Sequence, residues 1–376
     1  MDKRIVTDVA VIGDGPAGST VALKLSRLGL SVALLGLPFS SKKIFGETLP
    51  PDIKASLIHL GVWKDFLNDD HLPSAGNISV WGGTEIKENN FIFHPDSFGW
   101  HLDRLKFNSM LVNAAKKAGA FYSKSEIERM DIKFDKIWNL KLRDKKVIYT
   151  KFLVDATGRT SWFSRRQGIK RIAFDNICGY VSFHFSRTKE DSNSMTLIES
   201  APDGWWYSAL LPRNIRVTSF FTSVNLPAAH NARSRSGWEK IMNKTNYTKL
   251  NIENYNYEFI SGPHAMISNS SVLEKIIGQN WLAVGDASVT YDPLSSNGIL
   301  SAINNSIIVG DRIAENVSTK NESFEDYDKK IKADFCSYLV RRNYYYNLEK
   351  RWKNNTFWKE NQVPITSEYV LSKLQT

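Results

Sequence analysis

Three glycines near the start of the chain have the spacing of a phosphate-binding turn. Gly13, Gly15 and Gly18 lie between a strand-like stretch and a helix-like stretch in DVAVIGDGPAGSTVALKLSRLGLSVALL. In a βαβ unit the first glycine permits a tight turn, the second lets the backbone approach a pyrophosphate, and the third lets the helix pack on the strand. Free N–H groups at the helix start attract the phosphates. The spacing therefore predicts a dinucleotide-binding site at the first turn.

The acidic residue that usually holds the ribose is missing from this unit. Dinucleotide-binding units carry an Asp or Glu about 20 residues after the glycines, near the end of the second strand. This sequence has Leu35 and Gly36 there. The ribose must therefore be recognised in another way or by residues from elsewhere in the chain.

The segment DPLSSNG, residues 292–298, has the composition of a loop that holds a flat ring. It follows the apolar stretch NWLAVGDAS, which places Asp286 at a strand end, where its carboxylate can accept a hydrogen bond from a cofactor hydroxyl. The residues from Pro293 to Gly298 let a ring approach the backbone, and a helix that starts near Gly298 directs its positive end at that ring. A reduced flavin carries negative charge on its pyrimidine edge. The loop therefore predicts FAD.

The elements that must position these loops follow two patterns. Residues 11–18, 153–161 and 281–299 are glycine-containing strand ends, which we expect to converge at one sheet edge. From about residue 176 to 262 the pattern changes to alternating, aromatic-rich strands, which is typical of an antiparallel sheet. We predict an α/β fold in which a Rossmann-like FAD-binding domain is interleaved with an antiparallel-sheet substrate domain and followed by a helical C-terminal tail.

The length of 376 residues allows either one large α/β domain or two interleaved domains. The expected boundaries are 1–80, 101–175 and 266–320 for the FAD-binding domain, 81–100 and 176–265 for the substrate domain, and 321–376 for the tail.

Composition narrows the compartment and the class of partner. The net charge of +10 alone permits nucleic-acid binding, membrane-surface contact or an acidic substrate. Asp8, Asp14 and the glycines interrupt any signal-peptide core, and no apolar run reaches the roughly 18 residues that span a bilayer. Cys178 and Cys336 lie far apart without a CxxC, so neither a disulfide framework nor a thiolate metal site is indicated. We expect a cytoplasmic protein with no metal site and no membrane partner.

Five motifs together resemble the superfamily of FAD-dependent aromatic monooxygenases and flavin-dependent halogenases. They are Gly13-Asp14-Gly15-Pro16-Ala17-Gly18, GETLPP at 46–51, WHLDR at 100–104, DATGRTS at 155–161 and GDASVTYDPLSSNGI at 285–299. The resemblance implies an FAD-binding domain of glutathione reductase type, with Glu47 near the flavin's reactive edge and Arg104 near the cofactor. It also places Asp286 at the ribityl or pyrophosphate region, and the backbone of Gly298 and Ile299 at the pyrimidine. The predicted cofactor-binding residues are Gly13, Gly15, Pro16, Ala17, Gly18, Glu47, Arg104, Asp286, Pro293, Gly298 and Ile299.

Three departures separate this sequence from the halogenases of that superfamily. Those enzymes carry a lysine shortly after the GE segment, in the channel that conducts hypohalous acid to the substrate, but no lysine occurs between Lys64 and Lys87. Tryptophan halogenases add a glutamate in the counterpart of DPLSSNG, where this chain has Ser295. Halogenases also carry the signature Trp-x-Trp-x-Ile-Pro. In this sequence Tyr207 and Ala209 stand at the two tryptophan positions. We therefore expect the protein not to halogenate.

A closer resemblance is to the flavoproteins that accompany lysine and glycine oxidases and help to build cysteine tryptophylquinone. It rests on overall length, GETLPP, GWWYSALLP at 204–212, DPLSSNGI and an aromatic, basic C-terminal tail. It implies oxygenation of a tryptophan side chain in a partner polypeptide, with reduced FAD and O2 in a site shielded from water. The implied partners are the precursor of a quinone-cofactor oxidase and an external reductant, either NAD(P)H or a flavin reductase. The alternatives are a monooxygenase of a small aromatic substrate and, less favoured, a halogenase.

The candidate catalytic residues are Glu47, His264 and Tyr207. His264 stands where the chain returns to the FAD-binding domain and can serve as an acid or base. Tyr207 belongs to an aromatic strand that can form either a pocket wall or ordinary core. For Glu47 and Arg104 the alternative is an ordinary ion pair without a catalytic role.

The segment VRRNYYYNLEKRWKNNTFWK, residues 340–359, is the densest basic and aromatic cluster. As a docking surface for a protein substrate it offers complementary charge and aromatic anchors, which a small substrate would not need. One alternative is a solvated helix whose rings fasten the tail to the enzyme's own core. A nucleic-acid-binding surface is the other, but it leaves the flavin motifs unexplained, so we expect no nucleic-acid partner. The residues assigned to docking are Arg341, Arg342, Lys350, Arg351 and Lys353, with Tyr344, Tyr345, Trp352 and Trp358.

Overall fold

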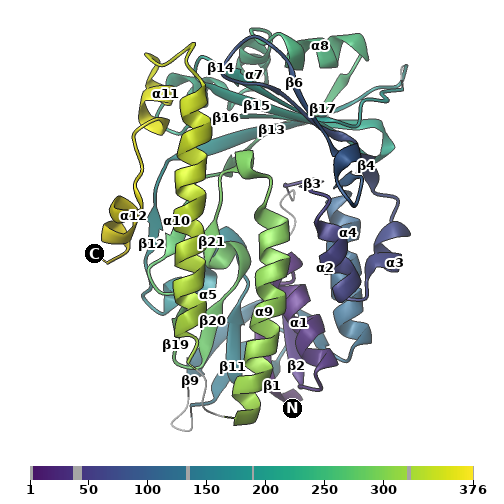
Figure 1. The fold of residues 1–376 in the computed structure, drawn as a ribbon. Coiled ribbons are helices and arrows are strands. Elements are labelled where there is room, and N and C mark those ends of the chain that lie inside the picture. Colours follow the sequence, from purple (N-terminus) through teal and green to yellow (C-terminus); the bar gives the residue numbers. More distant parts are fainter. Residues whose placement is uncertain (1–2, 37–44, 133–135, 189, 320–322, 376) are drawn as a thin grey trace.

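The computed structural model describes residues 3–36, 45–132, 136–188, 190–319 and 323–375. Two large sheets lie one above the other in the view of Figure 1, and the long helix α10 (Glu325–Leu348) runs alongside both. The lower sheet is built largely from parallel strands and the upper one largely from antiparallel strands. The predicted interleaved α/β fold is confirmed.

The lower sheet has the strand order β19-β20-β11-β1-β2-β8, and β10 and β9 extend it from β11. The pairs β1–β2, β1–β11, β11–β20 and β2–β8 are parallel, so the carboxyl ends of these strands share one edge. Its strands are β1 (Lys3–Ile12), β2 (Val32–Gly36), β8 (Phe121–Lys124), β9 (Ile127–Ile132), β10 (Trp138–Leu142), β11 (Lys146–Asp155), β19 (Ile277–Gly278) and β20 (Trp281–Ala283).

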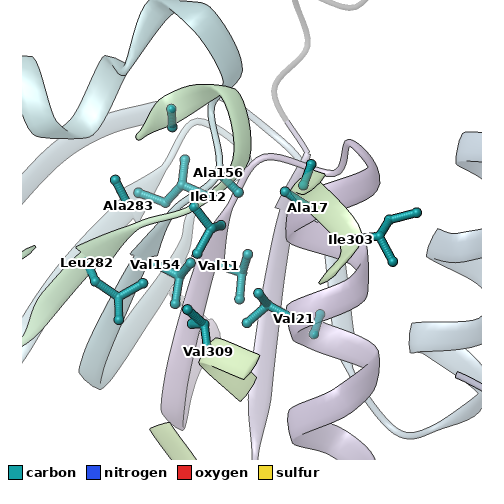
Figure 2. Packing of buried hydrophobic residues seen from close by; sticks show 14 of the residues in the cluster. Val11, Ile12, Ala17, Val21, Val154, Ala156, Leu282, Ala283, Ile303 and Val309 are labelled. Carbon is teal, nitrogen blue, oxygen red and sulfur yellow. The ribbon is translucent and has the colours of Figure 1, made fainter. Parts of the chain in front are cut away.

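Helices α1 (Pro16–Arg27) and α9 (Gly298–Thr319) cover one face of the lower sheet, side by side. Figure 2 shows Val11 and Val154 of the strands facing Val21 of α1, with Ile303 and Val309 of α9 nearby. All five side chains are buried. This packing fixes the first turns of both helices at the carboxyl edge of the strands.

The upper sheet has the order β17-β13-β16-β15-β14-β5-β6, and its pairs are antiparallel except for β14–β5, which is parallel. Strand β5 lies within residues 1–80, which we expected to belong wholly to the FAD-binding domain, yet it pairs with β14 of the upper sheet. The strands are β5 (Gly76–Val80), β6 (Lys87–Asn90), β13 (Ile177–Phe185), β14 (Thr196–Ala201), β15 (Gly204–Leu211), β16 (Ile215–Ser223) and β17 (Glu258–Ile267).

Helix α10 is part of both cores. Its inward stripe of Tyr327, Ile331, Phe335 and Leu339 recurs at every fourth residue and is buried with the lower sheet. About two turns beyond Leu339, Tyr346 packs with residues of the upper sheet. The C-terminal helices therefore connect the two sheets.

The remaining elements are short or lie at the periphery. They are α2 (Ile53–His59), α3 (Trp63–Leu67), α4 (Arg104–Lys117), α5 (Trp162–Arg166), α6 (Pro227–Asn231), α7 (Arg235–Met242), α8 (Tyr247–Asn254), α11 (Thr356–Asn361), α12 (Ser367–Gln375), β3 (Thr48–Leu49), β4 (Leu72–Ser74), β7 (Gly99–His101), β12 (Arg171–Ala173), β18 (Ser271–Leu273) and β21 (Val289–Thr290).

Candidate functional site

The three glycine-containing strand ends meet at the carboxyl edge of the lower sheet. Ile12 pairs with Asp155, and Asp155 pairs with Ala283 on the next strand. The parallel pairing extends just beyond the strands. The Ala156 N–H donates to the Ile12 carbonyl, and the Val284 N–H donates to the Asp155 carbonyl. The predicted convergence of these segments is therefore present.

The glycines of the first turn have different surroundings. Gly13 has a φ of +111°, and a Cβ there would overlap the Ala156 carbonyl. A Cβ at Gly18 would overlap the Gly13 carbonyl. A Cβ at Gly15 would meet nothing within 4 Å, and Gly15 lines the cavity described below. Gly13 and Gly18 are thus required by the fold, whereas Gly15 leaves open space in the cavity at the N-terminus of α1.

Glu47 and Arg104 are brought together by a small antiparallel sheet. Strands β3 and β7 pair Thr48 with His101, and Asp103 caps α4 by accepting from two backbone N–H groups. Arg104, in the first turn of α4, donates to the backbone carbonyls of Phe45 and Gly46. The two side chains form no direct ion pair within 4 Å. Both side chains line the cavity. The alternative in which Glu47 and Arg104 form an ordinary ion pair therefore does not describe the geometry.

A cavity of about 370 Å³ lies between the two sheets. The glycine turn, the segment after residue 45 and the DPLSSNG loop line it from the side of the lower sheet. Val181, Tyr207, Phe221 and Met266 line it from strands of the upper sheet. An apolar cavity at a domain junction with a few convergent polar groups is the usual form of a cofactor or substrate site.

Several further predicted cofactor residues border this cavity. The N-terminus of α9 opens toward it at Gly298, where a Cβ would meet nothing within 4 Å. Asp286 lies on its wall, and its carboxylate is 3.5 Å from the Arg159 guanidinium. The predicted residues that line the cavity are Gly15, Pro16, Ala17, Glu47, Arg104, Asp286, Pro293, Gly298 and Ile299. An open space over Gly15 and two helix N-termini fit a phosphate-bearing flavin at this place.

Glu47 is a buried acid with a displaced pKa. Its side chain is only 6% exposed, and the Gly46 N–H donates to Oε2, while Oε1 is buried with no hydrogen-bond partner among the described residues. Burial raises the pKa of Glu47 to about 7, against a smaller opposing effect from the charge of Arg104. Glu47 can therefore exchange a proton near neutral pH, as an acid or base requires.

We expect Glu47→Gln to stabilise the flavin-free protein above neutral pH. A folded-state pKa of about 7 lies above the ordinary value of 4.5, so the folded protein binds this proton more tightly. The contribution of Glu47 to stability is therefore full below pH 4.5 and is lost as the pH rises toward 7. Urea unfolding should show a gain of up to about 3 kcal/mol for the variant at pH 8 and little difference at pH 4.5. An equal difference at both pH values would contradict the displaced pKa.

The other two catalytic candidates occupy different positions. Tyr207 lines the cavity, and its hydroxyl shares a hydrogen bond with the Thr48 hydroxyl, next to Glu47. Burial raises the pKa of Tyr207, which keeps its hydroxyl protonated. His264, in β17, does not line the cavity, but its ring lies 6.2 Å from that of Phe45, which does. The cavity lining therefore includes Glu47 and Tyr207 but not His264.

Sequence reasoning missed the residues that hold the DPLSSNG loop from below. The Asp292 carboxylate accepts from Arg342 Nε at 2.8 Å and from the Tyr346 hydroxyl at 2.7 Å. The Asp292 N–H donates to the Tyr338 hydroxyl at 2.6 Å. All three partners come from α10, and Arg342 also lies 3.5 Å from the Asp175 carboxylate. Helix α10 therefore positions a wall of the cavity from a distance of some 50 residues in sequence.

Part of the predicted docking surface on the tail is therefore wrong. Arg342 is buried under the loop, and Trp358 is buried with its indole N–H donating to the Ala201 carbonyl. Arg351 donates to Glu349 and to Ser200. These side chains fasten the tail to the enzyme's own core. The docking residues that remain exposed are Arg341, Tyr344, Tyr345, Lys350 and Lys353.

Comparison with known proteins defines the class. The tryptophan halogenase family model matches residues 83–375, so the chain belongs to this family. LodB of Marinomonas mediterranea, which is named as an FAD-dependent oxidoreductase, is 26% identical over 94% of this chain and 96% of its own length. The 1H-pyrrole-2-carbonyl-[peptidyl-carrier protein] chlorinase of Pseudomonas fluorescens is also 26% identical, over 91% of this chain and 84% of its own.

Solved structures agree on the fold. The myxobacterial chondrochloren halogenase CndH has a TM-score of 0.82 at 19% identity, covering 98% of this chain and 88% of its own. The peptidyl tryptophan dihydroxylase QhpG, essential for tryptophylquinone cofactor biogenesis, has a TM-score of 0.69 at 21% identity, covering 95% and 78%.

These findings confirm the superfamily resemblance and the cofactor expected from the sequence. The protein is an FAD-dependent oxidoreductase of the tryptophan halogenase family. None of the described helices combines the length and the apolar character that a membrane span requires.

Proposed function

We propose that this protein is an FAD-dependent oxygenase that hydroxylates a tryptophan side chain of a partner protein, during biogenesis of a cysteine tryptophylquinone cofactor. The partner is the precursor of a quinone-cofactor oxidase, and an external reductant, NAD(P)H or a flavin reductase, supplies two electrons. One atom of O2 enters a ring C–H bond, and the other leaves as water. Likeness to LodB over nearly the full length of both chains and to QhpG in fold supports this choice.

The observation that carries the proposal is that the described lining of the cavity contains no lysine. Among the residues that the structure describes, those lining the cavity include no lysine, whereas Glu47 and Tyr207 are both there. A lysine is the group that the resemblance assigns to the transfer of hypohalous acid. Its absence from the described wall favours oxygen transfer over halogen transfer.

The chain's own residues have distinct proposed roles. FAD, when bound, supplies the electrons and the site of O2 activation. The first turn of α1, with Gly15 open, holds the pyrophosphate, and Arg104 and Asp286 border the cofactor. Glu47, with its pKa near 7, accepts or returns a proton beside the substrate ring. Phe45, Phe221 and their apolar neighbours exclude water from that ring.

The second candidate function is flavin-dependent halogenation. The family model and the chlorinase of Pseudomonas fluorescens favour it. Against it stand Ser295 in the loop, Tyr207 and Ala209 in place of the two signature tryptophans, and the composition of the cavity wall. A product that retains chlorine or bromine would decide for this function.

The proposal is tested by comparing substrates of increasing size. We expect modification of tryptophan in the precursor polypeptide, little in a short tryptophan peptide and none in free tryptophan, measured by mass spectrometry with equal O2 and reductant. Serine at Arg341, Lys350 and Lys353, which are exposed, should slow modification of the precursor several-fold, because complementary charge accelerates encounter.

The matched control for this surface is serine at Lys64, Lys117 and Lys141, which are exposed and lie on α3, α4 and β10. FAD content and thermal unfolding should match wild type in both triple variants. Equal rates with the precursor in both variants would exclude the tail as the docking surface, and preference for free tryptophan would exclude a protein substrate.

A further inference from the structure

The place of the missing ribose carboxylate at the end of β2 is taken by another carboxylate. Gly36 ends β2, and a Cβ at this residue would lie 2.9 Å from Asp14 Cγ and 3.0 Å from Tyr122 Oη. Asp14 stands between Gly13 and Gly15 in the first turn. Its side chain therefore reaches across to the strand end at which dinucleotide-binding units usually carry their acid.

Tyr122 holds the Asp14 carboxylate in that place. The Tyr122 hydroxyl donates to Asp14 Oδ2 at 2.8 Å. Tyr122 lies on β8, which pairs in parallel with β2 in the register Leu34 with Tyr122 and Gly36 with Lys124. A carboxylate has two oxygens with about four acceptor sites, so this one bond leaves Oδ1 able to accept further hydrogen bonds.

Chemistry and position together identify the ligand group. An ionised carboxylate only accepts hydrogen bonds, and the vicinal hydroxyls of a ribose donate two. Gly15 lies on the cavity, and Asp14 lies on the side of the turn nearer β2. A cofactor whose pyrophosphate lies over Gly15 would extend its adenosine toward β2, as the usual acidic residue requires.

We infer that Asp14, held by Tyr122, accepts the hydroxyl groups of the adenosine ribose of FAD in place of the missing acid at the end of β2. Gly36 belongs to the same site, because a side chain at this position would displace the Asp14 carboxylate. The inference concerns cofactor binding and does not depend on the proposed substrate.

The experiment measures binding of ADP and 2′-deoxy-ADP, which carry no flavin, to flavin-free protein by competition with FAD. Hydrogen bonds to charged groups contribute enough for roughly a tenfold difference or more. We expect wild type to bind ADP about tenfold more tightly than 2′-deoxy-ADP, and Asp14→Ala to bind both with the same weak affinity. The Kd for FAD should rise about tenfold in Asp14→Ala, whereas that for FMN, which lacks the adenosine, should not change.

Further variants separate this role from a structural one. Asp14→Gly combined with Gly36→Glu restores the usual arrangement and should recover the preference for ADP. Asp311→Ala, which removes a surface partner of Lys24, is the control and should bind like wild type. If Asp14→Ala does not fold, the wild type alone decides. A wild type that binds both nucleotides equally, or an Asp14→Ala variant that loses FMN and FAD equally, would overturn the inference.

Discussion

The Gly15→Val variant is expected to purify as a folded protein without bound FAD. Gly15 has extended backbone angles, φ −73° and ψ −177°, which valine adopts without strain. A Cβ there meets nothing within 4 Å, so the protein itself accommodates the new side chain. The added methyl groups instead occupy the space over the N-terminus of α1. Absorbance of flavin relative to protein should fall to background, whereas the circular dichroism spectrum should be unchanged.

Two other glycine variants make this result specific. Gly83→Val is the matched control, because a Cβ at Gly83 also meets nothing within 4 Å but lies outside the cavity lining. It should retain FAD. Gly18→Val should yield little folded protein, since its Cβ would overlap the Gly13 carbonyl. Full flavin occupancy in Gly15→Val would remove the basis for placing the pyrophosphate here.

Replacing Arg342 with methionine should destabilise the fold and weaken FAD binding together. Arg342 is buried between the Asp292 and Asp175 carboxylates, so its removal leaves buried charge without a partner. Breaking a buried ion pair in this way costs about 3–5 kcal/mol. Because Asp292 begins the DPLSSNG loop, we expect the loss of order to reach the cavity. Urea unfolding and FAD titration would measure the two effects.

The neighbouring residue supplies the control for Arg342. Arg341→Met changes the same charge on the exposed face of α10 and should alter stability by no more than about 0.5 kcal/mol. Combining Arg342→Met with Asp292→Asn should recover part of the lost stability, because the two sites are coupled. A stable Arg342→Met protein with normal FAD affinity would show that α10 does not position the loop.

The cofactor-binding frame was predictable because local patterns determine it. Apolar stretches that end in glycine-containing turns predict parallel strands. Because the carboxyl ends of parallel strands share one edge of the sheet, Gly15, Ala156 and Asp286 are expected at the same edge. The family resemblance of GETLPP and WHLDR implied that Glu47 and Arg104 lie near the cofactor, and both line the cavity. The convergence of the three strand ends needed no knowledge of contacts between distant side chains.

The features that the sequence did not reveal depend on which side chains of a helix or turn point into the protein and which point toward solvent. Residues 340–359 look uniformly basic and aromatic, but the helical period turns Arg342 and Tyr346 inward and leaves Arg341 and Tyr345 outside. The partner of Arg342, Asp292, lies 50 residues away in sequence. Asp14 was overlooked in the same way, since only the spatial approach of the turn to β2 shows its carboxylate at the strand end.

The most direct test of the proposed reaction is the isotopic composition of the product. The protein, FAD, reductant and precursor polypeptide are incubated under ¹⁸O2 with chloride and bromide present, and the tryptophan-containing peptide is analysed by mass spectrometry. We predict that its mass rises by one ¹⁸O atom for each ring C–H bond hydroxylated, with no halogen, and that Gly15→Val leaves the peptide unmodified. A halogenated tryptophan, or a product whose added oxygen is unlabelled and therefore comes from water, would contradict oxygenation by this enzyme.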